Sequence, residues 1–410
     1  MADITVYGAP WCPDCKRAKQ FLNEQRVPYD WVDVDADPEG LAFVEGLQDG
    51  GRTIPTIVFK DGSHLLEPTN AELAEKLGLE LRADRSAFDL VIVGGGPAGL
   101  SAAIYAAREG MDALVIEKSG LGGQAGVTER IDNYPGFVDG ISGAELAQRL
   151  ADHARRYAVT LLSAVEVTGI RRDETLGGHG MVIVDTSAGD SYCADAVLLA
   201  TGSRYRRLGI EGEDELIGAG IHFCATCDGP FYRGSDELLV VGGGNSALEE
   251  ALFLTKYADR VRIVARSGIA ASALVADKVR NHPGITIHTN TDVLSITGRP
   301  GKLESVTARD RESGEELTFR PAGAFVFVGL DPNTGPFTHT IDLDERGFIV
   351  TDGAFATSID GVFAAGDVRA GATRQVGSAV GEGIAALLAI RSFLERQHLR
   401  SEHKAEGPAS

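Results

Sequence analysis

The sequence is poor in positive charge and has no long apolar run. Lysine and arginine number 39 against 59 aspartates and glutamates, and the formal net charge of −20 would repel phosphate groups. No apolar stretch approaches the roughly 18 to 20 residues that cross a bilayer, and Met1 to Tyr7 has the pattern of a strand rather than a signal peptide. We therefore expect a cytoplasmic protein with no nucleic-acid or membrane partner.

Cysteine is also scarce, at five residues in 410, which argues against a structural disulfide framework. Four of the five form two Cys-x-x-Cys pairs, Cys12 with Cys15 and Cys224 with Cys227. Two thiols at this spacing can close a small disulfide ring, so each pair can store and release two electrons as a unit. The fifth, Cys193, lies in a strand-like run, where we expect a structural role.

The composition fits an α/β protein with many tight turns, since 43% of residues are hydrophobic and 51 are glycine. A length of 410 residues predicts about two or three domains. We expect a first domain at 1–80, a charged linker at 81–87, a discontinuous domain at 88–206 and 322–398, a further domain at 207–321, and a disordered tail at 399–410. The short linker would keep the two cysteine pairs at high effective concentration.

The second cysteine pair lies just ahead of an apolar strand and a glycine turn. Asp228 directly follows Cys227, and a carboxyl group there can shuttle the proton that a redox step requires. Lone histidines are more often structural or exposed than catalytic, and we interpret His222 and His339 in that way. Because Cys-x-x-Cys alone also serves zinc sites, the redox interpretation depends on the neighbouring glycine-rich motifs.

The first glycine-rich motif follows the apolar strand Asp89 to Val93. Gly94, Gly96 and Gly99 would let the chain turn, approach a pyrophosphate and pack a helix on the strand. The next strand ends in Glu117, where a carboxylate would accept a hydrogen bond from a ribose hydroxyl. This arrangement favours FAD or NAD.

A second such motif follows the strand Glu237 to Val241 and repeats the first nucleotide fold roughly 150 residues later. Two such folds are what a flavin and a pyridine nucleotide would each need. After the next strand, the chain offers the guanidinium of Arg266 and the hydroxyl of Ser267 to a 2′-phosphate, so we expect NADPH, with NADH possible. The expected ligands of this nucleotide are Gly242, Gly244, Asn245, Ser246, Ala247, Arg266 and Ser267.

The segment before the linker alternates strands and helices around Cys12-Pro13-Asp14-Cys15. The pattern places Cys12 at a helix N-terminus, where the helix dipole favours a thiolate. Lys16 and Lys19 would add to this effect, and Asp14 would oppose it. Ile54-Pro55 followed by a β-branched strand is typical of a cis-proline loop facing a dithiol.

Cys-Ala-Thr-Cys-Asp-Gly at 224–229 resembles, letter for letter, the redox centre of low-molecular-weight thioredoxin reductases. The likeness continues through the flavin-contacting stretches around residues 122–137, 361–368 and 374–376. It implies that FAD is held by Gly94, Gly96, Pro97, Ala98, Gly99, Glu117, Gly123, Gln124, Asn133, Thr201, Gly202, Gly366, Asp367, Arg374, Gln375 and Val376.

The chain departs from this family at the pyridine nucleotide. The reductases that use NADPH carry His-Arg-Arg and a further arginine four residues on, whereas here only Arg266 remains, with Ala265, Ser267 and Ala271 in the other places. Recognition of the 2′-phosphate could therefore be weak, dual or lost.

The first segment resembles a glutaredoxin over its whole length, and mycoredoxins most closely, through residues 51–56 and 59–63. Glutaredoxins that bind glutathione carry a Gly-Gly-x-Asp-Asp turn, and this chain has Glu67 to Glu72 instead. We therefore expect a different low-molecular-weight thiol, or a protein disulfide, as the partner.

The two resemblances together imply a relay. A nicotinamide hydride would reduce FAD, and FAD the Cys224/Cys227 disulfide, with Cys227 on the flavin side and Asp228 as proton donor. Cys224 would attack the Cys12/Cys15 disulfide, and Cys12 would reduce an external disulfide, with Cys15 resolving. Thioredoxin, a peroxiredoxin or a small-thiol disulfide are the candidate acceptors, and the same likeness implies a homodimer.

Three alternatives stay open. The chain could take its electrons from ferredoxin or a reduced flavin instead of a pyridine nucleotide. It could be a flavin-binding redox sensor without turnover. The two cysteine pairs could also form one four-thiolate zinc site, although the proline and aspartate inside the pairs argue against it.

Overall fold

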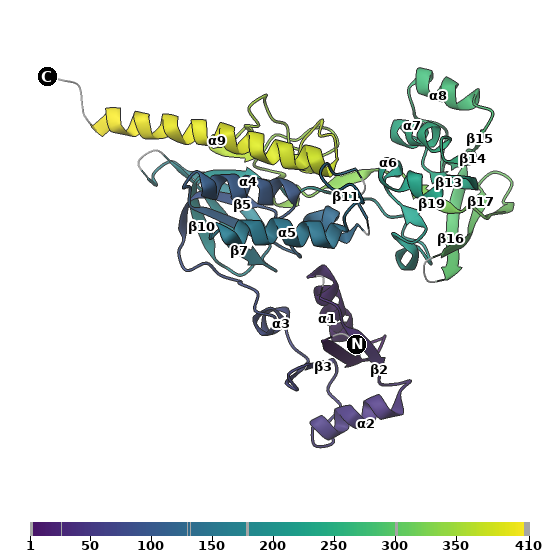
Figure 1. Cartoon of the computed structure of the whole chain (residues 1–410), viewed down its shortest axis with the longest axis horizontal. Helices are drawn as coiled ribbons and strands as arrows, with labels where there is room; N and C mark the ends of the chain where they lie inside the picture. The colour runs from purple at the N-terminus through teal and green to yellow at the C-terminus, as the bar shows by residue number, and fades with distance from the viewer. Residues whose placement is uncertain are drawn as a thin grey trace. The chain divides into compact units, whose positions relative to one another are not determined.

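The computed structural model describes residues 3–25, 27–128, 130–131, 133–177, 180–299 and 302–405 (Figure 1). The chain forms two compact α/β units. The first comprises Met1–Val127, Ala144–Gly202 and Thr334–Ser410, and the second comprises Thr128–Gly143 and Ser203–Asn333. The sequence pattern assigns 128–143 to the discontinuous domain, but here this segment pairs with itself through Ile131 and Ile141 and groups with the second unit.

The N-terminal part of the first unit is a small mixed sheet with helices, a thioredoxin-type fold. Its strands follow the order β2-β1-β3-β4, with β1 parallel to β2 and antiparallel to β3. Val6, Leu22, Ile57 and Leu73 are fully buried and form its core. The elements are β1 (Ile4–Gly8), α1 (Pro13–Glu24), β2 (Asp30–Asp33), α2 (Pro38–Leu47), β3 (Thr56–Phe59), β4 (His64–Leu66) and α3 (Asn70–Lys76).

The rest of the first unit is a larger sheet of order β7-β6-β5-β10-β9-β8, with β21 paired to β10. Strands β5, β6, β7, β10 and β21 are parallel, and their near-continuous apolar runs reflect burial on both faces. Helices α4 and α9 pack together on one face (Figure 1). The elements are β5 (Ala87–Val93), α4 (Pro97–Arg108), β6 (Ala113–Glu117), α5 (Gly143–Arg156), β7 (Thr160–Ser163), β8 (Val167–Asp173), β9 (Met181–Thr186), β10 (Ser191–Leu199), β21 (Val362–Ala364) and α9 (Val376–Ala405).

Helix α9 differs from two expectations drawn from the sequence. Its part Val376–Gln397 is long and apolar enough to cross a membrane by length and composition alone, with a mean hydropathy of 1.3. Ala386, Leu387 and Ile390 of this part are fully buried in the core of the first unit, although only 28% of the apolar window is buried. The tail that we expected to be disordered from 399 is helical as far as Ala405, because no glycine or proline interrupts it there; residues 406–410 lie outside the described residues.

The second unit is built on a parallel sheet of order β12-β19-β13-β14-β15. Leu238, Leu248, Ile263 and Phe325 are fully buried where α7 packs on this sheet. A three-stranded antiparallel sheet, β16-β17-β18, and the pair β11-β20 complete the unit. The elements are β11 (Ser203–Tyr205), β12 (Ile221–His222), α6 (Ala225–Asp228), β13 (Ser235–Val241), α7 (Asn245–Leu254), β14 (Ala258–Val264), α8 (Ala273–Arg280), β15 (Ile285–His288), β16 (Thr291–Arg299), β17 (Lys302–Asp310), β18 (Glu316–Phe319), β19 (Gly323–Val326) and β20 (Leu330–Pro332).

Candidate active site

Cys224 and Cys227 form a disulfide at the start of the short helix α6, in the second unit. Cys224 is the N-cap residue, and its sulfur accepts a hydrogen bond from the backbone N–H of Cys227 at 3.2 Å. Ala225 is fully buried and anchors the helix in the core. The aimed N–H would stabilise negative charge on the Cys224 sulfur after reduction.

Asp228 ends α6 and lies close to a buried histidine. Its Oδ2 is 3.5 Å from Nδ1 of His222, whose Nε2 is 2.7 Å from the hydroxyl of Tyr232. Burial, reinforced by the negative charge of Asp228, raises the pKa of Tyr232 to about 12. His222 is buried, and it bridges two polar groups rather than standing alone. Sequence reasoning did not single out Tyr232, because a tyrosine four residues beyond Asp228 has no motif of its own.

The second dithiol, Cys12 with Cys15, has the same local construction. Cys12 is the N-cap of α1, as predicted, and its sulfur accepts the backbone N–H of Cys15 at 3.1 Å. Both thiols are free and almost fully buried. The Cys12 thiol also contacts the carbonyl of Ile54 at 3.8 Å, next to the cis Ile54–Pro55 bond that the sequence pattern predicts.

The two thiols differ in their surroundings. Burial, together with a hydrogen bond that the Cys15 S–H donates to Cys12, raises the pKa of the Cys15 thiol to about 12. Asp14, which we expected to oppose a thiolate, is engaged by Arg17 at 3.1 Å, so its charge is partly compensated. Burial thus favours the protonated form of Cys15 at neutral pH, and the role of Cys12 as the attacking thiol stays a prediction.

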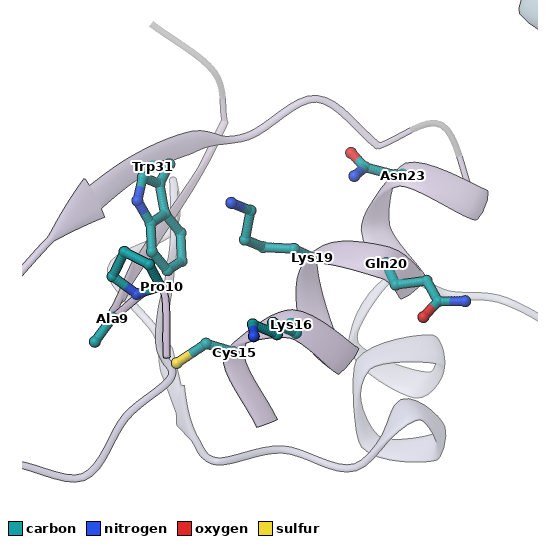
Figure 2. A pocket seen from close by; sticks show the side chains of 8 residues that line it. All are labelled: Ala9, Pro10, Cys15, Lys16, Lys19, Gln20, Asn23 and Trp31. Carbon is teal, nitrogen blue, oxygen red and sulfur yellow. The ribbon is translucent and has the colours of Figure 1, made fainter. Parts of the chain in front are cut away.

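A cavity of about 430 Å³ lies beside Cys15, between α1 and β2 (Figure 2). Lys16 and Lys19 extend into its lining from α1, and Lys19 Nζ is 4.2 Å from the ring centroid of Trp31 on β2. Gly8 is required here, since a Cβ at this position would lie 2.6 Å from the Cys15 sulfur and 2.8 Å from Trp31. The lining offers two cations and an aromatic ring to a small anionic ligand. Its residues are Ala9, Pro10, Cys15, Lys16, Lys19, Gln20, Asn23 and Trp31.

The turn before α3 differs physically from a glutathione-binding turn. Thr69 and Glu72 form a capping box, in which the Glu72 carboxylate accepts the backbone N–H and the hydroxyl of Thr69 at 2.7 and 2.8 Å. The hydrogen bonds lower the pKa of Glu72, so the carboxylate remains in place at neutral pH. The Thr69 N–H is thereby engaged within the protein rather than presented to a tripeptide.

The first glycine motif lies where the parallel strands of the large sheet end together. Val93 pairs with Ile116 and Leu199, and Leu199 with Ala364. Ligands of doubly wound sheets bind at such carboxyl ends. The predicted FAD residues that follow these strand ends are Gly94, Gly96, Pro97, Ala98, Gly99, Glu117, Thr201, Gly202, Gly366 and Asp367.

The backbone at this edge requires glycine and leaves room for a ligand. Gly94 has φ +111°, and a Cβ on Gly99 would lie 1.9 Å from the Gly94 carbonyl oxygen. A Cβ on Gly96, in contrast, would meet only Gly123, at 4.0 Å, so the N-terminus of α4 can be approached by a phosphate. The Glu117 carboxylate accepts the N–H of Gly95 at 2.7 Å, which holds it where a ribose hydroxyl would be recognised.

The remaining predicted FAD residues supply polar groups that suit a flavin nucleotide. The Nε of Arg374 is buried and, within the described part of the chain, has no hydrogen-bond partner. Burial raises the pKa of Asp367 to about 6, against the opposing charge of Arg374. A polyol or phosphate oxygen would satisfy both groups, so these residues fit FAD. Gly123 and Gln124 lie in a 3-10 turn, Gln375 and Val376 at the start of α9, and Asn133 in an exposed turn of the second unit.

The second glycine motif has the same construction in the second unit. Gly242 has φ +145°, and a Cβ there would lie 2.4 Å from the Phe327 carbonyl oxygen, whereas Gly244 faces open space. Asn245 begins α7 and accepts the N–H of Ser272 at 2.7 Å, which fixes the loop beside the helix N-terminus. Ser246 and Ala247 follow in the first turn of α7. This helix N-terminus can receive a pyrophosphate.

Beyond strand β14 the structure places Asp292 and Arg311 beside the predicted Arg266, and the sequence pattern had indicated neither of these two charged residues. Arg266 is 82% exposed and lies 3.5 Å from Asp292, and Arg311 lies 3.4 Å from the other oxygen of the same carboxylate. Arg311 also donates to the backbone carbonyl of Arg266 at 3.4 Å. Two arginines thus flank the exposed Ser267, and the second comes from the β17–β18 turn, where no nucleotide motif would have located it.

No group of three or more His, Cys, Asp or Glu side chains arranged to hold a metal ion occurs among the residues that the structure describes.

Known proteins resemble this chain in both parts. Residues 88–383 match the family model of pyridine nucleotide-disulphide oxidoreductases, and residues 4–65 match that of glutaredoxins. The thioredoxin reductase of Bacillus subtilis (strain 168) is 35% identical over 76% of this chain and 96% of its own length. That of Mycolicibacterium smegmatis is 38% identical over 77% of this chain and all of its own length. The crystal structure of thioredoxin reductase from Streptococcus pyogenes MGAS5005 has a TM-score of 0.71 and 36% identity, covering 76% of this chain and 99% of that one. The chain therefore belongs to the pyridine nucleotide-disulphide oxidoreductases, of the thioredoxin reductase type, with an N-terminal glutaredoxin domain.

Proposed function

We propose that this disulfide oxidoreductase passes electrons from a pyridine nucleotide to Cys224/Cys227, from there to Cys12/Cys15 in its own glutaredoxin domain, and on to an external disulfide. Its family uses FAD and a pyridine nucleotide. FAD, when bound, would supply the two-electron step between the nicotinamide and the Cys224/Cys227 disulfide. The observation that carries the proposal is that both dithiols have the same N-cap geometry, each with an N–H aimed at the first sulfur.

The thiol chemistry balances without any further reactant. Two electrons break the Cys224–Cys227 bond, and Cys224 then attacks the Cys12–Cys15 disulfide to give a mixed disulfide that Cys227 resolves. Two electrons and two protons thereby move to Cys12 and Cys15, with Asp228 as the proton donor. Cys12 attacks the external disulfide in the same way, and Cys15, whose burial keeps it protonated, resolves the product.

We propose NADPH as the preferred nucleotide. Arg266 and Ser267 are the residues that we expect to meet a 2′-phosphate, and Arg311 provides a second guanidinium beside Arg266. A 2′-phosphate would pair with both arginines, although it would compete with Asp292 for them. Competition of this kind supports a moderate rather than an absolute preference over NADH.

We propose a low-molecular-weight disulfide as the acceptor, with thioredoxin or a peroxiredoxin as the alternatives. The two lysines of the cavity beside Cys15 favour an anionic small thiol (Figure 2). The Glu67 to Glu72 turn argues against glutathione, because it departs from the Gly-Gly-x-Asp-Asp pattern and the Thr69 N–H is already engaged by Glu72. We also propose a cytoplasmic homodimer, on the likeness to the thioredoxin reductases and the use of cysteine in paired dithiols.

An anaerobic titration tests the relay. NADPH, and separately NADH, is added while flavin bleaching is followed and free thiols are counted in the wild type and in the double variant Cys224→Ser, Cys227→Ser. We expect the wild type to gain both dithiols, and the variant to bleach while Cys12 and Cys15 stay oxidised.

Two other results would redirect the proposal. If Cys12 and Cys15 stay oxidised in the wild type as well, the glutaredoxin domain does not receive its electrons from Cys224/Cys227. If neither nucleotide bleaches the flavin, the donor is of another kind, such as ferredoxin or a reduced flavin. A flavin that bleaches without any steady consumption of nucleotide in the presence of disulfides would indicate a sensor.

A further inference from the structure

His222 is a buried titratable residue that the relay described above does not use. It lies two residues before Cys224, on strand β12, and its side chain is only 7% exposed. Both ring nitrogens face polar side chains of residues that follow Cys227 in the sequence. Nε2 is 2.7 Å from the Tyr232 hydroxyl, and Nδ1 is 3.5 Å from Oδ2 of Asp228.

The surroundings of His222 leave these two groups as its polar neighbours. Strand β19 contributes the ring of Phe325, whose centroid is 5.2 Å from the histidine ring, and this aromatic neighbour also packs against Tyr232. Asp228 comes from α6, and Tyr232 from the 3-10 turn Gly229–Tyr232 that follows. Asp228 is itself only 18% exposed, so the carboxyl and the imidazole interact in a partly desolvated site.

Nε2 of His222 contacts the Tyr232 hydroxyl, and the tautomer of the ring decides which of the two is the donor. Because burial raises the pKa of Tyr232 to about 12, the phenol stays neutral at physiological pH and can accept the Nε2–H of the ring. With Nε2 occupied in this way, Nδ1 is the nitrogen that takes a proton from Asp228 or returns one to it. The 3.5 Å separation is long for a hydrogen bond in the resting disulfide, and a small movement of the Asp228 carboxyl would close it.

We propose that His222 is a positioning residue for the thiol chemistry, which holds the Asp228 carboxyl beside Cys224/Cys227 and shares its proton through Nδ1. The proposal depends on the proposed function in one respect, the role of Asp228 as proton donor. His222 would act only through the Asp228 side chain, whereas Asp228, Cys224 and Cys227 take part in the thiol chemistry directly.

The proton balance is as follows for one external disulfide. The Cys224 thiol loses its proton to Asp228 as its sulfur attacks, and the proton is shared between the carboxyl and Nδ1 of His222. The same proton then passes to the first sulfur that leaves the acceptor. Cys227 closes the Cys224–Cys227 bond, and its proton passes to the second leaving sulfur. Two electrons and two protons have moved to the acceptor, and Asp228 and His222 end in their starting states.

The test uses the full chain with Cys12→Ser and Cys15→Ser, so that only Cys224 and Cys227 deliver electrons. In this background the reduced protein is mixed with two probes in a stopped-flow instrument. Bis(2-hydroxyethyl) disulfide releases a basic thiolate that needs a proton, whereas 5,5′-dithiobis(2-nitrobenzoate) releases an acidic thiolate that does not. A residue that serves proton delivery affects the first probe more than the second.

We expect His222→Asn to slow reduction of bis(2-hydroxyethyl) disulfide on the order of 10²-fold and to change its pH profile, with a much smaller loss on the aromatic disulfide. Tyr232→Phe, which removes only the hydroxyl, should show the same probe dependence with a smaller loss. The exposed His339, changed to Asn, is the matched control and should leave both rates unchanged.

A double-variant cycle separates positioning from a structural role. If His222 acts through Asp228, the double variant Asp228→Asn, His222→Asn is no slower than Asp228→Asn alone. Losses that multiply, or that are equal for the two probes, would overturn the proposal. If His222→Asn does not fold, as judged by circular dichroism, the same cycle with Tyr232→Phe decides. If the parental protein, Cys12→Ser, Cys15→Ser with His222 and Tyr232 unchanged, reduces neither probe, the proposed function of Cys224/Cys227 is refuted instead.

Discussion

Replacement of Arg311 by glutamine tests whether Arg266 and Arg311 together recognise a 2′-phosphate, as the proposed preference for NADPH requires. Arg311 and Arg266 contact the two oxygens of Asp292 at 3.4 and 3.5 Å, so both guanidinium groups lie within reach of one small anion. The perturbation removes the charge of Arg311 and leaves the Arg266 side chain in place.

The expected magnitude follows from exposure. Charge-assisted hydrogen bonds contribute roughly 1.5–3 kcal/mol, and exposed ion pairs roughly 0.2–1 kcal/mol. The Arg311 side chain is 50% exposed and that of Arg266 82%, which places both near the lower range. We therefore expect Arg311→Gln to cost about 1 kcal/mol, which weakens binding of a 2′-phosphate roughly fivefold. Asp292→Asn should tighten binding by a similar factor, because it removes the competing carboxylate.

Calorimetric titration with 2′,5′-ADP and with 5′-ADP measures this effect without any turnover. Arg309→Gln is the matched control, since Arg309 lies at the end of β17, just before the turn that carries Arg311, and pairs with Glu316 at 2.7 Å. An equal loss of 2′,5′-ADP affinity in Arg309→Gln would refute a specific role of Arg311. An equal loss of 5′-ADP affinity in Arg311→Gln would refute it too, because that ligand has no 2′-phosphate.

Three further predictions concern Cys15 of the first dithiol and Gly99 and Asp367 of the expected FAD site. Cys15→Ser should accumulate a mixed disulfide between Cys12 and a small-thiol substrate, seen as an added mass, because the resolving thiol is gone; absence of the adduct would count against Cys12 as the attacking residue. Gly99→Ala should lower both flavin content and the unfolding midpoint, since its Cβ would lie 1.9 Å from the Gly94 carbonyl oxygen; normal flavin content would show that the loop can yield. In flavin-free protein, Asp367→Asn should raise stability relative to the wild type at pH 8 and keep only a small part of that advantage at pH 4. The folded pKa of Asp367, about 6, lies above the ordinary 3.8, so the stabilising contribution of the protonated wild-type carboxyl is fully present below the ordinary pKa and is lost as pH rises from there through 6. This difference in pKa corresponds to roughly 3 kcal/mol. A pH-independent difference in unfolding midpoint between the two proteins would contradict that assignment.

Much of the fold could be predicted because buried parallel strands have a distinctive sequence pattern. Asp89 to Val93 and Glu237 to Val241 are apolar runs that end in glycine turns, and both are strands of parallel sheets in the structure. The helices after the turns begin earlier than the apolar spacing from Leu100 and Leu248 indicates, at Pro97 and Asn245. The first turn of each contributes only a small core residue, Ala98 or Ala247, which gives a weak apolar signal in the sequence.

The parts of the site that the sequence did not indicate are those that tertiary contacts assemble. Arg311 is 45 residues from Arg266, and no local pattern links a turn between antiparallel strands to a nucleotide motif. Tyr232 and His222 are close in sequence but become partners only because α6 folds the chain back between them. His222 reads as a lone histidine along the chain, but its chemistry depends on Tyr232 and Asp228, which are its neighbours in space.

The two dithiols share one local construction, so a difference in reduction potential between them must come from their wider surroundings, and the nearby charges are one part of these. In each pair a backbone N–H stabilises negative charge on the first sulfur. Asp228 follows directly after Cys227, and its negative charge disfavours a thiolate there. Lys16 follows directly after Cys15, and Asp14 is compensated by Arg17, so the surroundings of Cys12/Cys15 are more positive. A positive environment stabilises the reduced, thiolate-bearing form and raises the reduction potential of a dithiol. The sign of these charges therefore favours transfer from Cys224/Cys227 to Cys12/Cys15, the direction that the proposed relay requires.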